Sequence, residues 1–200
     1  MPQERSSITP AGPDAMLAAT LHAAAKGHES LIQAIASLPT PIYITDAEGW
    51  ITSFNPACID FAGRTPVPGQ DRWCVSWRLY SERGAPISHD ACPMAEAIRE
   101  RRPVRGAVAV AERPDGTRVI FTPYPTPLFD ADGALIGAIN MLIDVTDARQ
   151  AAALHVEAQR CRRLASSIGD ERTCATLRLM AEEYDAQAKA LRSPEGCVPA

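Results

Sequence analysis

The chain has 200 residues, of which 46% are hydrophobic and 22% charged, and its net charge at pH 7 is −4. This length and apolar content suffice for one domain of ordinary size with appendages. The mild negative charge argues against nucleic acid as a partner. The sequence contains neither a long apolar run that would span a membrane nor a secretory signal at its start. These features predict a cytoplasmic chain that neither binds nucleic acid nor enters a membrane.

The six cysteines lie at positions 58, 74, 92, 161, 174 and 197. They lack the short-spaced pairs that a structural zinc site uses. Free thiols in a reducing compartment are therefore the expected state, and no metal site is predicted.

Residues 1–27 begin with prolines and small polar residues and continue with alanines, which predicts a flexible segment with a short helix. A second helical stretch carries Leu31, Ile35 and Leu38 at helical spacing, and the prolines that follow end it. Residues 193–200 are predicted to be a disordered tail.

The stretch PIYITDAEGWITSFN predicts two short strands, over 42–45 and 50–54, with a turn between them. Asn55 is well placed as the N-cap of a short helix with Pro56 at its first position. Residues 64–86 are rich in Pro, Gly, Trp and Arg and show no period, so this long connection is a candidate cover for a pocket.

A helix is expected over 94–101 and a strand over 104–112. Two further strands, over 118–128 and 134–145, form a hairpin around an Asp-Gly turn. The last strand is apolar on both faces, which predicts burial on both sides. Asn140 interrupts it, and a buried amide needs a partner from the protein, from water or from a ligand. A structural role for Asn140 is favoured, and a ligand-binding role stays open.

From residue 148 onward the apolar spacing is helical, with a break at Gly169 and Asp170 that divides it into two helices. The element order predicts an α+β fold with a five-stranded antiparallel sheet and helices on one face, an N-terminal helix and a C-terminal α-helical hairpin. The expected division is a flexible segment over 1–27, a sensory domain over 28–147, a helical hairpin or coiled-coil output segment over 148–192, and the tail.

Three segments in this order resemble a PAS domain, the small sensory module of signalling proteins. They are IYITDAEGWITSFNPA, HDACPMAEAIRERRPV and ERPDGTRVIFTPYPTPLFDADGALIGAINMLIDVTD, within about residues 29–147. The HDACPMA stretch resembles a subgroup common in bacterial sensor histidine kinases. By this resemblance, Asp144 and Thr146 lie where the family couples the last strand to an output helix. The kinase phosphoacceptor box and ATP lid are missing from the sequence.

The resemblance also suggests two cofactors that this fold can bind, a flavin and haem. A flavin-adduct photosensor of this fold needs an Asn-Cys-Arg-Phe-Leu-Gln box, and the stretch DRWCVSW around Cys74 lacks it. A haem sensor needs a histidine that points into the pocket, and His89 is better explained as a polar residue at a helix entrance. A haem or flavin redox or gas sensor remains an alternative, so the cofactor is unknown and none need be present. No catalytic signature is found, which predicts a protein that is not an enzyme.

A pocket for a small apolar ligand is one interpretation of the interior, and a plain hydrophobic core is the other, slightly favoured one. The candidate lining residues are Ile44, Phe54, Phe61, Trp73, Trp77, Met94, Ile98, Phe121 and Asn140.

The predicted function is a non-catalytic sensory module that binds a small ligand, a partner protein or both. It relays the change through its C-terminal helices, in a bacterial pathway of the two-component type. The expected partners are a second copy of the chain and a histidine kinase or response regulator. A purely structural dimerisation domain is the alternative. The candidate interface residues are Ile139, Met141, Leu154, Leu177 and Tyr184.

Overall fold

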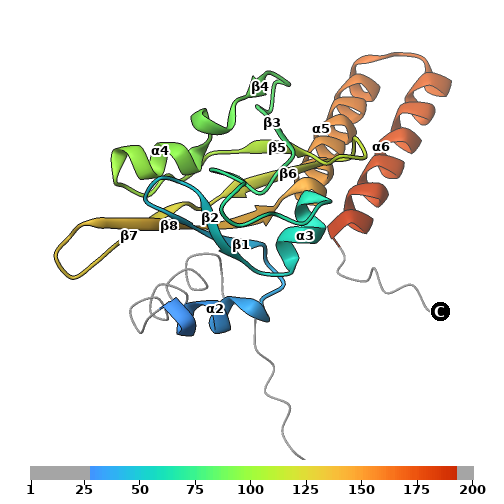
Figure 1. Ribbon diagram of the computed structural model, residues 1–200. Coiled ribbons are helices and arrows are strands. Elements are labelled where there is room, and N and C mark those ends of the chain that lie inside the picture. Colours follow the sequence, from blue (N-terminus) through green and yellow to red (C-terminus); the bar gives the residue numbers. More distant parts are fainter. Residues whose placement is uncertain (1–27, 193–200) are drawn as a thin grey trace, which may run out of the picture. The chain divides into compact units, whose positions relative to one another are not determined.

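The computed structural model describes residues 28–192, in two compact units divided between Ile143 and Asp144 (Figure 1). We call residues 28–143 the sheet unit and residues 144–192 the helical hairpin. The predicted flexible segment over 1–27 and the predicted tail over 193–200 lie outside the described residues.

An antiparallel sheet forms the centre of the sheet unit, which confirms the predicted α+β class. Its strands follow the order β2-β1-β8-β6-β5-β3-β4, and β7 also pairs with β8. The first and last strands are therefore neighbours, and Tyr43 on β1 lies opposite Asn140 on β8. The strands are β1 (Ile42–Asp46), β2 (Ile51–Phe54), β3 (Arg78–Tyr80), β4 (Pro86–Ile87), β5 (Ala109–Glu112), β6 (Arg118–Pro123), β7 (Thr126–Phe129) and β8 (Leu135–Asp144).

The strand count differs from the five predicted, because the sheet has eight segments. Strands β3 and β4 come from the region interpreted as irregular, where pairing with β5 makes strands out of a sequence without a period. The strand predicted over 118–128 is divided into β6 and β7. The Tyr124 N–H donates to the Met141 carbonyl (2.8 Å), and the Pro125 carbonyl accepts from the Val104 N–H on the other side (3.3 Å). Pro123 and Pro125 offer no N–H, so the ladder lacks a donor at these two positions, whereas Tyr124 between them still pairs with β8.

The helices between the strands lie over one face of the sheet, as predicted, and the predicted N-terminal helix covers the other face (Figure 1). Helix α3 (Ala57–Ala62), the 3-10 turn η1 (His89–Ala91) and helix α4 (Pro93–Glu100) lie over one face, with Ala138 and Leu142 of β8 beneath them. Helix α2 (His28–Ala36) packs Leu31 and Ile35 on the opposite face. Successive residues of a strand point to opposite faces, so the doubly apolar β8 needs a cover on each.

This packing corrects part of the predicted interface. Ile139 and Met141 are 0% and 1% exposed, because α2 of the same chain covers them. In this arrangement they present no surface to a partner.

Asn55 holds the end of α2 against the sheet. Its Oδ1 accepts a hydrogen bond from the Ile42 N–H (2.9 Å), and its Nδ2 lies 2.8–3.1 Å from the carbonyls of Ile35, Leu38 and Thr40. The predicted N-cap role is therefore not what its side chain does, since α3 begins at Ala57 and the Asn55 amide points to β1 and α2. A buried amide with this many partners fixes three segments at one point.

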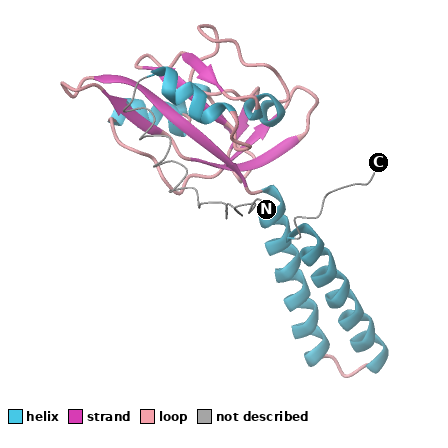
Figure 2. Cartoon of the chain, turned by 90° about the horizontal axis from the view of Figure 1, so that it is seen from below, coloured by secondary structure: helices cyan, strands magenta, loops and turns pink. Residues whose placement is uncertain are grey.

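The helical hairpin consists of α5 (Thr146–Ser167) and α6 (Glu171–Arg192), which run side by side (Figure 2). Asp170 starts α6 as predicted, because its Oδ2 accepts from the Thr173 N–H (2.8 Å). The seam buries Ala158, Cys161 and Ala181. Small residues at these positions allow the two backbones to approach closely.

Candidate functional site

A chain of hydrogen bonds crosses the apolar core of the sheet unit. The Tyr124 N–H donates to Asn140 Oδ1 (3.0 Å), Asn140 Nδ2 donates to the Tyr43 hydroxyl (3.0 Å), and that hydroxyl donates to the Trp73 carbonyl (2.8 Å). Tyr43 and Asn140 are 0% and 2% exposed. The amide of Asn140 is therefore satisfied by protein groups, which agrees with the favoured structural role. The same chain of hydrogen bonds connects the link between β6 and β7, strands β8 and β1, and the loop before β3.

Three thiols lie in the same core. Cys58, Cys74 and Cys92 are buried, and Cys74 Sγ lies 3.0 Å from Ser76 Oγ. Burial raises the pKa of Cys58 and of Cys92 to about 12, and burial likewise raises the pKa of Tyr43 above its usual value. The thiols of Cys58 and Cys92 therefore stay protonated at neutral pH, and a protonated thiol is a poor nucleophile. The arrangement suits binding rather than covalent chemistry.

Trp73 closes this core at the loop and carries a strained backbone. Its φ is +70°, a conformation that residues other than glycine seldom adopt. The turn between β1 and β2 holds it there: its N–H donates to the Gly49 carbonyl (2.7 Å), and its indole lies so close to Gly49 that a Cβ there would come within 2.2 Å of the ring. The Arg72 guanidinium lies 4.6 Å from the ring centroid. Strain held in place by several contacts marks a candidate site of movement.

A hollow opens to solvent beside Trp73. Its volume is about 270 Å³, below the roughly 300–1,000 Å³ of sites for drug-sized ligands. It has an apolar floor, and Asp90 and Arg99 bring charge to it. The lining residues are Trp73, Asp90, Ala95, Ile98 and Arg99.

The structure brings most of the predicted pocket residues together. Phe61, Met94, Ile98 and Phe121 belong to one buried cluster on the α4 side of the sheet, and Phe61 and Phe121 meet edge to face at 5.1 Å. Phe54 and Trp73 pack against this cluster, and Asn140 joins it through Tyr43.

Two predicted lining residues lie elsewhere. Ile44 is on the α2 face, because its neighbour Tyr43 takes the position opposite Asn140. Trp77 is 49% exposed and borders a second hollow of about 240 Å³, together with Tyr80 and His89. Sequence reasoning missed Tyr43 and Cys92. A tyrosine in an otherwise apolar strand was the available signal, since its hydroxyl needs a partner when buried.

His89 borders the second hollow and not the core that contains Asn140. Burial lowers its pKa, and the nearby Arg64 guanidinium, paired with Asp71 at 2.9 Å, adds to this effect. Haem does not fit there, because the hollow is small and charged groups lie beside the imidazole. A flavin does not fit at Cys74 either, because the thiol is enclosed in the packed core and bonded to Ser76. Among residues 28–192, no three His, Cys, Asp or Glu side chains gather as metal ligands.

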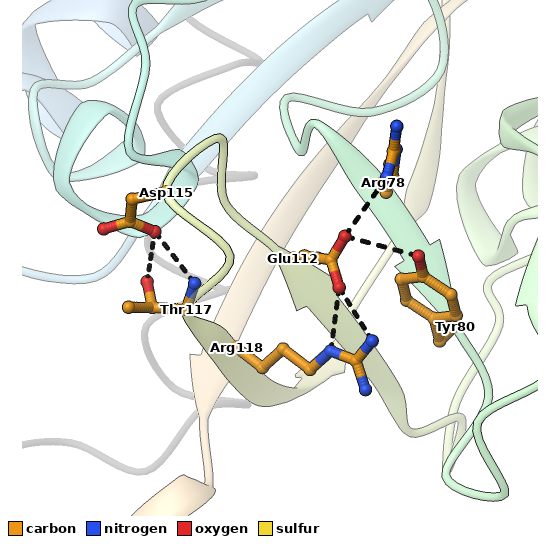
Figure 3. A network of polar contacts seen from close by, with 6 residues as sticks. All are labelled: Arg78, Tyr80, Glu112, Asp115, Thr117 and Arg118. Atoms are coloured by element: carbon orange, nitrogen blue, oxygen red, sulfur yellow. Dashed lines mark hydrogen bonds and ion pairs between the residues drawn. The ribbon is translucent and has the colours of Figure 1, made fainter.

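A charged network lies on strands β3, β5 and β6 (Figure 3). Glu112 on β5 accepts from the Arg118 guanidinium (2.7 and 2.9 Å) and from the Tyr80 hydroxyl (3.3 Å), and it lies 3.5 Å from Arg78. The hydrogen bonds from Arg118, above all, hold the pKa of Glu112 below its usual value. Asp115 in the following turn accepts from the N–H and hydroxyl of Thr117. The contacts of Glu112 connect β3, β5 and β6 on the exposed surface of the sheet unit.

The strand that carries Asn140 leads directly into the hairpin. Asp144 ends β8, and its Oδ1 accepts from the Thr146 N–H (2.8 Å) at the first residue of α5. The N-cap residue of α5 is Val145, which has no side-chain cap, and the Asp144 carboxylate supplies an acceptor to the first N–H of the helix. Both residues assigned to signal coupling take part in this one contact.

The family model of the PAS fold matches residues 35–150, which is more than half of the chain. The chain belongs to the PAS fold family. PAS domains are sensory signalling modules and generally lack catalytic activity. Among the helices of residues 28–192, none combines the length and hydropathy needed to cross a bilayer.

Solved PAS and LOV structures resemble this PAS protein in fold. The PAS domain of Bordetella pertussis BvgS is 22% identical, with 59% of this chain and 84% of that chain covered and a TM-score of 0.38. The PAS domain of the fruit-fly ELK potassium channel is 10% identical, with 59% and 96% covered and a TM-score of 0.48. The Rhodobacter sphaeroides LOV protein is 11% identical, with 88% and 96% covered and a TM-score of 0.41. A comparison with curated proteins finds no match. We take no functional conclusion from these likenesses.

Proposed function

We propose that the protein is a sensor of a small, mainly apolar molecule that enters beside Trp73 and alters the hydrogen-bond chain through Tyr43 and Asn140. The observation that carries this proposal is the strained backbone of Trp73, at the boundary between the hollow and that chain. A ligand that displaces the indole would free the Trp73 carbonyl from Tyr43. The volume of the hollow restricts the ligand to less than drug size.

The response passes along β8 to the hairpin. Asn140 and Asp144 lie four residues apart on one strand, so a shift of Asn140 acts on the cap of α5 with no flexible linker between them. The hairpin then presents the change to a second copy of the chain through Leu154, Leu177 and Tyr184. A histidine kinase or response regulator is the further partner in this proposal, which rests on the HDACPMA resemblance.

The pocket is tested with Trp73→Gly. Glycine accepts φ +70° without strain, but loss of the indole removes packing against the buried cluster, so the variant should be less stable than the parent protein and its folding is checked by circular dichroism first. Native mass spectrometry of the full chain should then show a changed content of retained small molecules. Trp77→Ala is the matched control, since Trp77 is exposed and borders the other hollow. Identical retention in parent, variant and control would refute a ligand site at Trp73.

The relay is tested with Asp144→Ala. Loss of the carboxylate that accepts from the Thr146 N–H should cost about 1 kcal/mol of helix stability and speed amide exchange in the first turns of α5. Exchange in β1 and β8 should stay unchanged. Asp147→Ala serves as control, because Asp147 lies one residue further into the same turn. Equal exchange in all three proteins would argue against signal transfer at this junction.

A further inference from the structure

Thr45 on β1 carries a buried hydroxyl that lacks a protein partner. The residue is 2% exposed, and within the described residues 28–192 no group forms a hydrogen bond with its Oγ1. A buried hydroxyl that stays unpaired destabilises a fold, and valine would occupy nearly the same space without that cost. Most buried polar groups are paired, so this one points to a partner from outside the chain.

The Thr45 side chain faces the core beneath α4. Its cross-strand neighbours are Ile51 on β2 and Ala138 on β8. Residues directly opposite each other on antiparallel strands have their side chains on the same face. Both neighbours belong to the buried cluster that includes Ala95 and Ile98 of α4. The hydroxyl therefore points to the face that α4 covers, and not to the face that α2 covers.

Trp73 contacts β1 and the following turn on both sides of Thr45. Its carbonyl accepts from the hydroxyl of Tyr43 (2.8 Å), which precedes Thr45 on the same face of the strand. Its indole and its N–H meet Gly49, which follows Thr45 in the turn to β2. Thr45 thus lies between two contacts of Trp73, under the residue that closes the hollow.

The hollow carries its charge at the mouth. Asp90 and Arg99 are exposed there, and the Arg99 guanidinium donates to the Asp90 carbonyl (3.3 Å). The inner wall is made by Ala95 and Ile98, which are apolar and buried. Burial of a charged ligand group against them would cost more than one hydrogen bond to Thr45 returns. The inner end of the site therefore suits a neutral group.

We infer that the Thr45 hydroxyl selects the ligand, which is a small neutral molecule with an apolar body and one hydroxyl or carbonyl oxygen. This inference rests on the proposed sensor function and names the ligand class of that site. A ligand that displaces the Trp73 indole reaches Thr45, and its oxygen pairs with a hydroxyl that can both donate and accept. A hydrocarbon of the same shape leaves the hydroxyl unpaired and binds more weakly.

The first test makes the same substitution at two buried threonines of the full chain. Thr45→Val removes a hydroxyl without a protein partner, so Tm should stay the same or rise. Thr126→Val is the matched control, because Thr126 Oγ1 accepts from Arg105 (2.9 Å) and Thr126 lies opposite Ile139 on the α2 face. Tm of the control should fall. An equal fall in both variants would reveal a structural partner for Thr45 and overturn the inference.

The second test uses benzyl alcohol and ethylbenzene, two probes of nearly the same shape that differ in one hydroxyl. Affinities are measured by NMR titration of the full chain, with the indole N–H of Trp73 as the reporter. Thr45→Val should weaken the binding of benzyl alcohol about tenfold, because one hydrogen bond is lost. The same variant should bind ethylbenzene at least as well as the parent protein. Thr126→Val should change neither affinity.

The outcomes separate this inference from the proposed function. Unchanged affinity of Thr45→Val for benzyl alcohol would overturn the inference and leave the ligand site standing, since the parent protein would still bind the probe. Binding of neither probe to the parent protein would overturn the ligand class stated for Thr45. The retention test with Trp73→Gly then decides independently whether the site itself fails.

Discussion

The two units bury different kinds of side chain. In the sheet unit, the fully buried residues include many large side chains, among them Tyr43, Met94, Ile139 and Leu142. In the hairpin, the most deeply buried residues are alanines, such as Ala151, Ala158 and Ala181. Burial stabilises in proportion to the apolar area removed from water, so an alanine seam contributes much less per residue. Pairs of helices with so little buried area are marginal in isolation. The sheet unit therefore has a core of large side chains, whereas the hairpin gains less stabilisation per buried residue.

Gly137→Ala should break the sheet unit most severely. Gly137 has φ +155°, and an added Cβ would lie 2.0 Å from the Thr45 carbonyl oxygen, so β1 and β8 would have to separate. We expect a loss of about 4 kcal/mol or more in the free energy of unfolding, measured by urea denaturation of the full chain. Gly133→Ala is the control, since it shares a positive φ but has open space around it, and should cost only about 1–2 kcal/mol. Equal losses would mean that strand contact at Gly137 is unimportant.

Truncation of one buried residue in each unit compares them directly. Ile139→Ala should cost about 2–5 kcal/mol, because it leaves a cavity under α2. Ala158→Gly in the seam should cost about 1 kcal/mol, mainly through helix propensity. Amide exchange, measured separately for β8 and α5, assigns each loss to its unit. A larger loss from Ala158→Gly would show that the seam, and not the sheet core, carries more of the stability.

The smallest expected effect concerns the charged networks at the surface. The pKa of Glu112 is lowered in the folded chain, chiefly by Arg118, and that of Asp185 is lowered chiefly by Arg162. A lowered pKa means that the stabilisation is complete above the pKa of the unfolded chain and disappears as pH falls through the folded value. Glu112→Gln should therefore lower Tm slightly at pH 7 and leave it unchanged near pH 3.

Asp185→Asn should show the same pH dependence, with the change confined to amide exchange in the hairpin. If the destabilisation of either variant relative to the parent protein became larger as pH falls, the predicted pH dependence of that network would be wrong.

The sequence was informative where the signal was local. The doubly apolar β8, the Asp170 helix start and the break at Gly169 all follow from neighbouring residues. The face that each residue of β1 occupies depends on the register between β1 and β8, which are far apart in the chain, and this is why Ile44 was assigned to the wrong face. Strands β3 and β4 and the cover that α2 provides likewise arise from long-range pairing. The strained Trp73 had no sequence signal, since positive φ is normally inferred from glycine.

The contact of Asn55 with α2 has a consequence for solubility. One amide connects the end of α2 to β1, and α2 hides Ile42, Ile44, Ile139 and Met141. A chain that began after Ala36 would retain the sheet and the opposite core, yet it would expose a continuous aliphatic surface. Patches of this kind drive aggregation of folded molecules. Helix α2 therefore protects the protein from self-association through the sheet, and truncation would first be seen as precipitation and not as unfolding.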